Sequence, residues 1–139
     1  IIVNRNTLLD QTLATLKRAW PGVDLGVAHG RKHEYDKQVV VTTIQTASYP
    51  NRLDKLLNSG TFNLCIIDEA HHAPAQSYQL VLGELGFLKE DSNDQLLLGV
   101  TATPTRIGSL KLADTFQTLT FEIPIGELIH KGYLCKVRA

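Results

Sequence analysis

The residues best suited to chemistry form the string Asp68-Glu69-Ala70-His71-His72, which directly follows an apolar run. Two adjacent carboxylates at the end of a buried strand are unfavourable unless partners or a function stabilise them. One carboxylate can hold Mg²⁺ through water, because Mg²⁺ keeps much of its hydration shell. The next can orient and deprotonate a water molecule for attack on a phosphoryl group. The pattern therefore predicts that Asp68 binds the metal ion and that Glu69 is the general base.

The residue types alone leave two other interpretations of this string open. The acids could stabilise the N-terminus of the following helix, where negative charge is favourable. Alternatively, the acids and histidines could form a metal site of the zinc type. The HExxH spacing is absent, and adjacent histidines point in different directions on a helix or a strand, so the histidine metal centre is the weaker interpretation.

A second candidate is the string Thr101-Ala102-Thr103-Pro104, which follows the apolar run 95–100. Hydroxyl groups at a strand exit can carry hydrogen bonds between a nucleotide site and another element. The same letters also make an ordinary turn. Because ligands of parallel sheets bind at the carboxyl ends of the strands, the position of Thr101 and Thr103 one strand after the acidic string favours a functional interpretation.

Strands alternate with helices along the chain. Apolar and β-branched runs predict strands at 1–3, 23–29, 38–44, 62–67 and 95–100, with further candidates at 118–123 and 133–137. Residues 9–20 have helical periodicity, with Asn6 and Thr7 as capping candidates and Asp10 in the first turn. Further helices are predicted within 47–58, 75–88 and 125–131, and a polar loop at 30–37. This alternation indicates an α/β fold, a parallel sheet flanked by helices on both faces.

Composition sets the remaining limits. The 139 residues suit one domain, and an apolar fraction of 43% supports a core. Lys+Arg and Asp+Glu are equal at 14 each, so binding to nucleic acid would have to use a local cluster of positive charge. Cys65 and Cys135 form neither a zinc spacing nor a disulfide framework, which favours an intracellular setting. No run approaches the length of a membrane span. The chain lacks methionine and opens on a strand, so we expect an internal part of a longer protein.

The apolar run into DEAHH, followed by TATP after the next strand, resembles motifs II and III of superfamily 2 helicases of the DEAH-box group. Val3-Asn4-Arg5 with Leu8 and Gln11 is similar to motif Ia, although Asn4 stands where that motif commonly has proline. Residues 41–46 are similar to the T-x-Q segment. The tail from Arg106 through Phe116 to Gly132-Tyr133-Leu134 resembles the end of the first motor domain. Only Ile107 separates Arg106 from Gly108, where many relatives have an extra acidic residue.

The resemblance implies a RecA-like P-loop NTPase fold, incomplete at its N-terminus, with residues 1–139 forming a single partial ATP-binding domain that covers motifs Ia to III. It implies ATP and Mg²⁺ as cofactors, with Asp68 handling Mg²⁺ through water and Glu69 activating water. His71, the third residue of the catalytic set, would couple the nucleotide site to Thr101 and Thr103.

The resemblance also implies partners for this chain. Arg5, Thr43 and Gln45 would lie along the track of a nucleic acid, with DNA favoured over RNA and no membrane partner. A second RecA-like domain of the same parent chain would complete the nucleotide cleft.

The phosphate-binding pattern G-x-x-x-x-G-K-[ST] does not occur in the 139 residues. We therefore expect the parent protein, and not this piece alone, to be an ATP-dependent helicase or translocase. A catalytically inactive, helicase-like scaffold is the alternative. The basic string Arg31-Lys32-His33 is compatible with a solvated loop or with a contact to a nucleic-acid backbone.

Overall fold

A single sheet with strand order β3-β2-β4-β1-β5-β6 organises the molecule. The computed structural model describes residues 1–89, 94–103 and 112–135. The strands are β1 (Ile2–Val3), β2 (Leu25–His29), β3 (Lys32–His33), β4 (Val39–Thr43), β5 (Leu64–Asp68) and β6 (Leu96–Val100). Every neighbouring pair is parallel except β2 with β3. The predicted, mainly parallel α/β sheet is thus confirmed.

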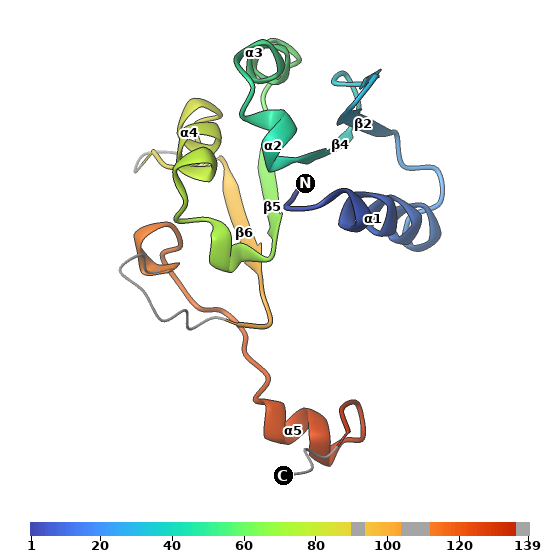
Figure 1. The fold of residues 1–139 in the computed structure, drawn as a ribbon, viewed down its shortest axis with the longest axis vertical. Helices are drawn as coiled ribbons and strands as arrows, with labels where there is room; N and C mark the ends of the chain where they lie inside the picture. Colours follow the sequence, from blue (N-terminus) through green and yellow to red (C-terminus); the bar gives the residue numbers. More distant parts are fainter. Residues whose placement is uncertain (90–93, 104–111, 136–139) are drawn as a thin grey trace.

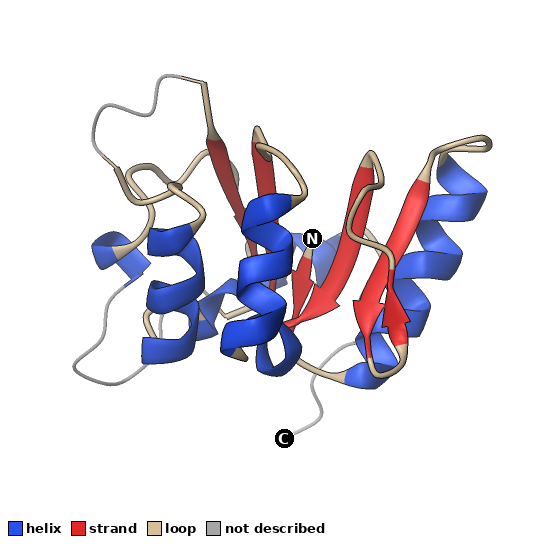
Figure 2. Ribbon diagram, turned by 90° about the horizontal axis from the view of Figure 1, so that it is seen from above, coloured by secondary structure: helices blue, strands red, loops and turns tan. Residues whose placement is uncertain are grey.

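Helices cover both faces of this sheet (Figure 2). They are α1 (Asn6–Ala19), α2 (Ile44–Ala47), α3 (Pro50–Asn58), α4 (Gln76–Glu84) and α5 (Ile125–His130), with short 3₁₀ turns at η1 (Ala70–His72) and η2 (Leu112–Asp114). Helix α5 lies away from the sheet at the C-terminal end (Figure 1). Within the described ranges, the helices lack the length and apolar character that crossing a membrane requires.

The alternation of side chains along the strands builds two cores, one on each face of the sheet. Val3, Val27 and Val41 pack against α1, whose core-facing residues are Leu9, Leu13 and Leu16. Their strand neighbours Ile2, Ala28 and Val40 face the opposite, larger core. That core also contains Leu53 and Leu56 of α3 and Val81 and Leu82 of α4. The β-branched run of β4 is therefore buried on both sides, as its sequence predicts.

The ends of several elements differ from the sequence-based expectation. Helix α1 begins at Asn6, with Arg5 in the N-cap position and no side-chain cap, so the predicted capping by Asn6 or Thr7 is wrong. Asp10 consequently lies beyond the first turn. The predicted helix at 75–88 is shorter, because α4 ends at Glu84 and the chain turns at Gly86 with a φ of 88°. The helix predicted within 47–58 is confirmed as α3, which begins with Pro50 in its first turn, while the separate α2 ends at Ala47.

Two segments were assigned to the wrong class from sequence. The predicted loop at 30–37 contains β3, which pairs with β2 in antiparallel register. The predicted strand at 118–123 does not form, and its side chains Leu119 and Phe121 are 68% and 76% exposed. A β-rich composition makes a strand only where a neighbouring strand offers a ladder and a packing surface.

Residues 133–135 are likewise not a strand, and the rest of that prediction lies outside the described residues. The predicted short helix near 125–131 is confirmed as α5, which ends before Gly132 with a φ of 77°.

The buried thiol of Cys65 offers a test of the central sheet. Burial raises its pKa from 9.0 to about 11, whereas Cys135 is exposed. Because the thiolate is the reactive form, we expect iodoacetamide at pH 8 to alkylate Cys135 and to reach Cys65 only after denaturation. Mass spectrometry of the labelled protein, with Cys135→Ser as the control, measures this. Equal labelling rates at both cysteines would contradict the buried position of β5.

Candidate active site

Strand β5 brings Asp68 to the carboxyl edge of the sheet. It lies between β1 and β6, with Asp68 in register with Val100. Cys65 and Ile67 point into the larger core and are 4% and 0% exposed, which fixes the strand in the middle of the fold. Asp68 is the last residue of the strand, which therefore ends one position later than the predicted strand 62–67. The two carboxylates thus stand at the edge where parallel sheets bind ligands.

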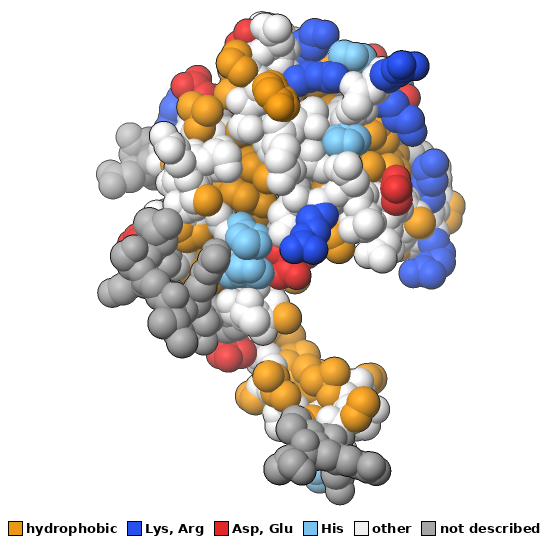
Figure 3. All heavy atoms as spheres, viewed as in Figure 1, with side chains coloured by type: hydrophobic (Ala, Val, Ile, Leu, Met, Phe, Trp, Pro, Cys, Tyr) orange, Lys and Arg blue, Asp and Glu red, His pale blue; other side chains and the backbone are white. Residues whose placement is uncertain are grey.

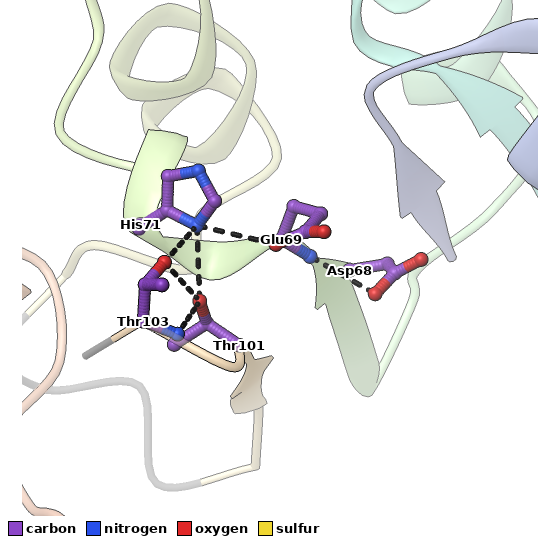
Figure 4. Close-up of polar contacts among 5 residues, drawn as sticks. All are labelled: Asp68, Glu69, His71, Thr101 and Thr103. Carbon is purple, nitrogen blue, oxygen red and sulfur yellow. Dashed lines mark hydrogen bonds and ion pairs between the residues drawn. The ribbon is translucent and has the colours of Figure 1, made fainter. Parts of the chain in front are cut away.

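Glu69 has an unusual backbone conformation. Its φ and ψ of 55° and 51° are left-handed, and within the described residues no other non-glycine residue has a positive φ. Such conformations cost energy and concentrate at functional sites. The backbone N–H of Glu69 donates to Asp68 Oδ1 at 3.0 Å, and the two carboxylates point to different sides (Figure 4). Glu69 occupies the N-cap position of η1 without a side-chain capping bond, which argues against simple helix capping.

His71 joins the acidic string to the end of β6. Its Nδ1 lies 2.9 Å from Thr101 Oγ1, 3.2 Å from Thr103 Oγ1 and 3.2 Å from Glu69 Oε2 (Figure 4). The backbone N–H of Thr103 also donates to Thr101 Oγ1 at 3.1 Å. A carboxylate can only accept a hydrogen bond, so the contact with Glu69 requires a proton on Nδ1. The same N–H can turn between the carboxylate and the threonine hydroxyls, which makes His71 a physical link between the two motifs.

The donor set at Asp68 and Glu69 fits a hydrated divalent cation. Within the described residues no lysine or arginine forms an ion pair with either carboxylate. The buried Asn4 Oδ1 and the Tyr78 hydroxyl lack hydrogen-bond partners among the same residues. Burial and, after it, the charge of Asp68 raise the pKa of Tyr78 to about 12. Oxygen ligands, an excess of negative charge and partnerless polar atoms suit Mg²⁺ with its water shell.

A histidine metal centre receives no support from the geometry. The rings of His71 and His72 lie 4.1 Å apart between centroids and are tilted by 45°. Across the three described ranges, no three His, Cys, Asp or Glu side chains come together as metal ligands. Nδ1 of His71 is also occupied by the threonine hydroxyls and Glu69.

Gly99 allows β6 to approach η1 closely. A Cβ atom at this position would lie 2.5 Å from Phe116 Cζ and 2.8 Å from Ala70 Cβ. We expect Gly99→Ala to lower the free energy of unfolding by about 1–3 kcal/mol, because overpacking forces neighbouring groups to move. Urea unfolding measures the change. Gly83→Ala is the matched control, since nothing lies within 4 Å of its added Cβ and alanine is the better helix former. Equal stability of the two variants would contradict the close approach.

The three predicted nucleic-acid residues occupy different environments. Arg5 is exposed after β1, and Gln45 is exposed after β4, where its Nε2 donates to the backbone oxygen of Asn4 at 3.0 Å. Thr43 is 0% exposed, and its hydroxyl accepts from the backbone N–H of Thr46 at 3.3 Å as the N-cap of α2. The Thr43 hydroxyl is enclosed and supports the turn that carries Gln45, and the predicted contact of Thr43 with nucleic acid stays a prediction.

Sequence reasoning missed a polar network beside Thr43. His29 Nδ1 lies 2.9 Å from Thr46 Oγ1 and 3.3 Å from Thr43 Oγ1, and Thr43 Oγ1 donates to Thr46 Oγ1 at 2.9 Å. The signal available in the sequence was a threonine directly before a short helix, the preferred residue type for an N-cap.

Of the residues in the predicted domain-closing tail, Arg106 and Gly108 lie outside the described residues, whereas Phe116 packs beside the larger core.

A mostly parallel sheet between two helical layers, with acidic side chains at its carboxyl edge, defines the RecA-like α/β class. The chain belongs to the family described as type III restriction enzyme, res subunit, which matches residues 1–106.

Two named relatives support this assignment. The chain is 31% identical over 142 residues to a protein of Saccharomyces cerevisiae named "Putative ATP-dependent helicase IRC3", covering 99% of the chain and 20% of that protein. It is 26% identical over 132 residues to "Probable helicase D10" of Escherichia phage T5, covering 93% of the chain and 27% of that protein. The chain thus spans about a quarter or less of the length of these relatives.

Proposed function

We propose that the protein containing this chain is an ATP-dependent helicase or translocase of the DEAH-box type, and that the chain is most of its first motor domain. The observation that carries the proposal is the contact of His71 Nδ1 with Glu69 on one side and with Thr101 and Thr103 on the other. This contact connects a candidate hydrolytic acid to the end of the neighbouring strand. A motor that moves along nucleic acid needs such a connection between ATP hydrolysis and nucleic-acid binding.

Each residue has a distinct role in this proposal. Asp68 holds Mg²⁺ through water, and Mg²⁺, when bound, offsets charge on the terminal phosphates of ATP. Glu69 accepts the proton of the attacking water. Its half-buried position and left-handed backbone hold the carboxylate at the edge of the sheet. The Nδ1–H group of His71 can hydrogen-bond either to Glu69 or to Thr101 and Thr103. A movement of Glu69 would therefore change the hydrogen bonds of the two threonines.

The nucleic-acid side of the motor uses the ends of β1 and β4. Arg5 supplies a positive charge and Gln45 a neutral amide, both exposed at the edge that also carries Asp68. Contacts of this kind reach phosphates and sugars without reading the sequence. That property suits a motor that moves along any sequence, and we favour DNA over RNA as its partner. Thr43 acts indirectly by fixing α2.

The remaining parts of the motor belong to the parent protein. We propose that its phosphate-binding glycine loop and a second RecA-like domain complete the ATP site, and that the protein acts inside the cell. The piece comprising residues 1–139 is expected to be inactive alone.

ATP hydrolysis by the full-length protein tests this function. The rate is measured with and without single-stranded DNA, duplex DNA and RNA, in Mg²⁺ and in excess EDTA. We expect hydrolysis that requires Mg²⁺ and accelerates with nucleic acid, most with DNA. Hydrolysis that no nucleic acid changes, or an absence of hydrolysis, would favour the inactive scaffold instead.

A further inference from the structure

The hairpin of β2 and β3 presents positive charge at its turn. Ala28 pairs with His33 and His29 with Lys32, so Gly30 and Arg31 form a two-residue turn. Gly30 has a φ of 58°, the positive value that a type II′ hairpin turn needs at its first central position. Arg31 at the tip and Lys32 beside it are exposed. With Arg52 and Lys55 of α3 they form what we call the basic hairpin surface, and lysines and arginines gather over this part of the molecule (Figure 3).

Arg52 fixes the hairpin to α3. Its Nη1 donates to the Tyr35 hydroxyl at 2.8 Å, to His33 Nδ1 at 2.9 Å and to the Lys32 carbonyl at 3.3 Å. Its Nη2 donates to the Gly30 carbonyl. All of these acceptors are uncharged. Arg52 therefore orders the turn while its own positive charge stays uncompensated.

The positive charges of this surface are not neutralised by ion pairs within the described residues. Desolvation and the charges of Arg52 and Lys55 lower the pKa of His33, which keeps that ring neutral. In the described part of the chain, no carboxylate forms an ion pair with Arg31, Lys32, Arg52 or Lys55.

Two acids of the same segment are engaged away from the turn. Glu34 Oε2 accepts from the backbone N–H of Val27 at 2.9 Å, and Asp24 pairs with Lys37 at 3.3 Å. The positive charge of the hairpin is therefore concentrated at its turn.

The hairpin turn and the proposed nucleic-acid residues share one edge of the sheet. Strand β2 runs parallel to β4 with Ala28 opposite Thr42, and β4 runs parallel to β1 with Thr43 opposite Val3. The turn after β2, Gln45 after β4 and Arg5 after β1 therefore emerge side by side. Two strand spacings of about 4.8 Å separate β2 from β1, which corresponds to roughly three nucleotides at a rise of about 3.4 Å.

Hydrogen bonds make this edge one connected surface. His29 Nδ1 lies 2.9 Å from Thr46 Oγ1, which joins the end of β2 to α2. Gln45 Nε2 donates to the carbonyl of Asn4, which joins the end of β4 to the end of β1. The basic hairpin surface thus continues the path that passes over Arg5 and Gln45.

We propose that the basic hairpin surface binds the sugar–phosphate backbone of the nucleic acid and extends the track beyond Gln45 to the outer strands of the sheet. The inference rests on the proposed motor function. Arg31 and Lys32 contact phosphates, while Arg52 is a positioning residue that holds the turn. These contacts add affinity that depends on salt and is independent of sequence.

The test is the salt dependence of oligonucleotide binding by the full-length protein carrying Arg31→Ala and Lys32→Ala together. We expect weaker binding of single-stranded DNA, about tenfold near 0.1 M salt, and a slope of log Kd against log salt smaller by about 1.4, because each phosphate contact contributes about 0.7. The exchange Arg31→Lys with Lys32→Arg should preserve the slope, since it keeps both charges. Fluorescence anisotropy measures the affinity, and thermal unfolding verifies the fold of each variant.

Lys17→Ala with Arg18→Ala is the matched control, because both residues are exposed in the last turn of α1 and the net charge changes equally. An unchanged slope in the hairpin variant, or an equal loss in the control, would overturn the hairpin contact. If Arg5→Ala weakens binding while the hairpin variant does not, this inference fails and the motor function stands. If the unaltered protein binds no nucleic acid, both fail together.

Discussion

Glu69→Gln is expected to reduce ATP turnover by the full-length protein by about 10²–10⁴-fold, the usual contribution of a positioned general base. Glutamine keeps the size and a hydrogen-bonding oxygen of the side chain but cannot accept a proton from water. Affinity for ATP and for nucleic acid should therefore remain close to that of the unaltered protein. Steady-state phosphate release measures turnover, and a fluorescent nucleotide measures binding. Glu84→Gln, at an exposed position of α4, is the matched control and should retain activity.

Turnover by Glu69→Gln equal to that of the control would remove Glu69 from the chemistry. A loss of nucleotide binding together with turnover would give Glu69 a role in binding and not in proton transfer. We expect proton transfer and not nucleotide binding to be the role of Glu69, because its Oε2 contacts the imidazole of His71 at 3.2 Å and is positioned by it.

His71→Ala is expected to uncouple ATP binding from nucleic-acid binding. Coupling between two ligand sites typically changes affinity by about 5–150-fold. The variant removes the Nδ1 group that contacts Glu69, Thr101 and Thr103, so the physical connection between the two motifs is lost. The measurement is the ratio of Kd values for DNA with and without a non-hydrolysable ATP analogue. We expect this ratio to approach one.

His71→Asn separates this role from a structural one, because its amide can reach the same neighbours and should restore part of the coupling. His130→Ala, on the exposed α5, is the control. Full coupling in His71→Ala would show that Thr101 and Thr103 receive their signal by another route. A large fall in thermal stability of His71→Ala that His71→Asn does not repair would assign the histidine to the fold.

The central strands could be predicted from sequence because they are continuous runs of apolar and β-branched residues. Residues of β4 are buried on both sides, and this requires helices on both faces of the sheet, whereas β5 is buried on the side of the larger core, where Cys65 and Ile67 pack. The hairpin strand β3 could not be predicted, since Lys32 and His33 carry no alternating apolar pattern and are held by pairing with β2 and by Arg52. The segment around Phe121 shows the reverse case, where a β-rich sequence lacks a neighbour to pair with.

The chemical types at the site were also predictable, but their geometry was not. The spacing of Asp68, Glu69 and Thr101 indicates that they lie at adjacent strand ends, and they do. The left-handed backbone of Glu69 depends on how the chain leaves β5 and enters η1, which no local propensity encodes. The burial of Thr43 depends on α2 folding back over β4, and its partner His29 comes from a different strand.

The location of the bound nucleotide tests the central claim most directly. A crystal structure of the full-length protein with Mg²⁺ and a non-hydrolysable ATP analogue would locate the terminal phosphate. We predict that a magnesium-bound water lies within hydrogen-bond distance of the Asp68 carboxylate and that Glu69 faces the water aligned for attack. A nucleotide bound elsewhere, with positions 68 and 69 facing only protein or bulk solvent, would contradict the account.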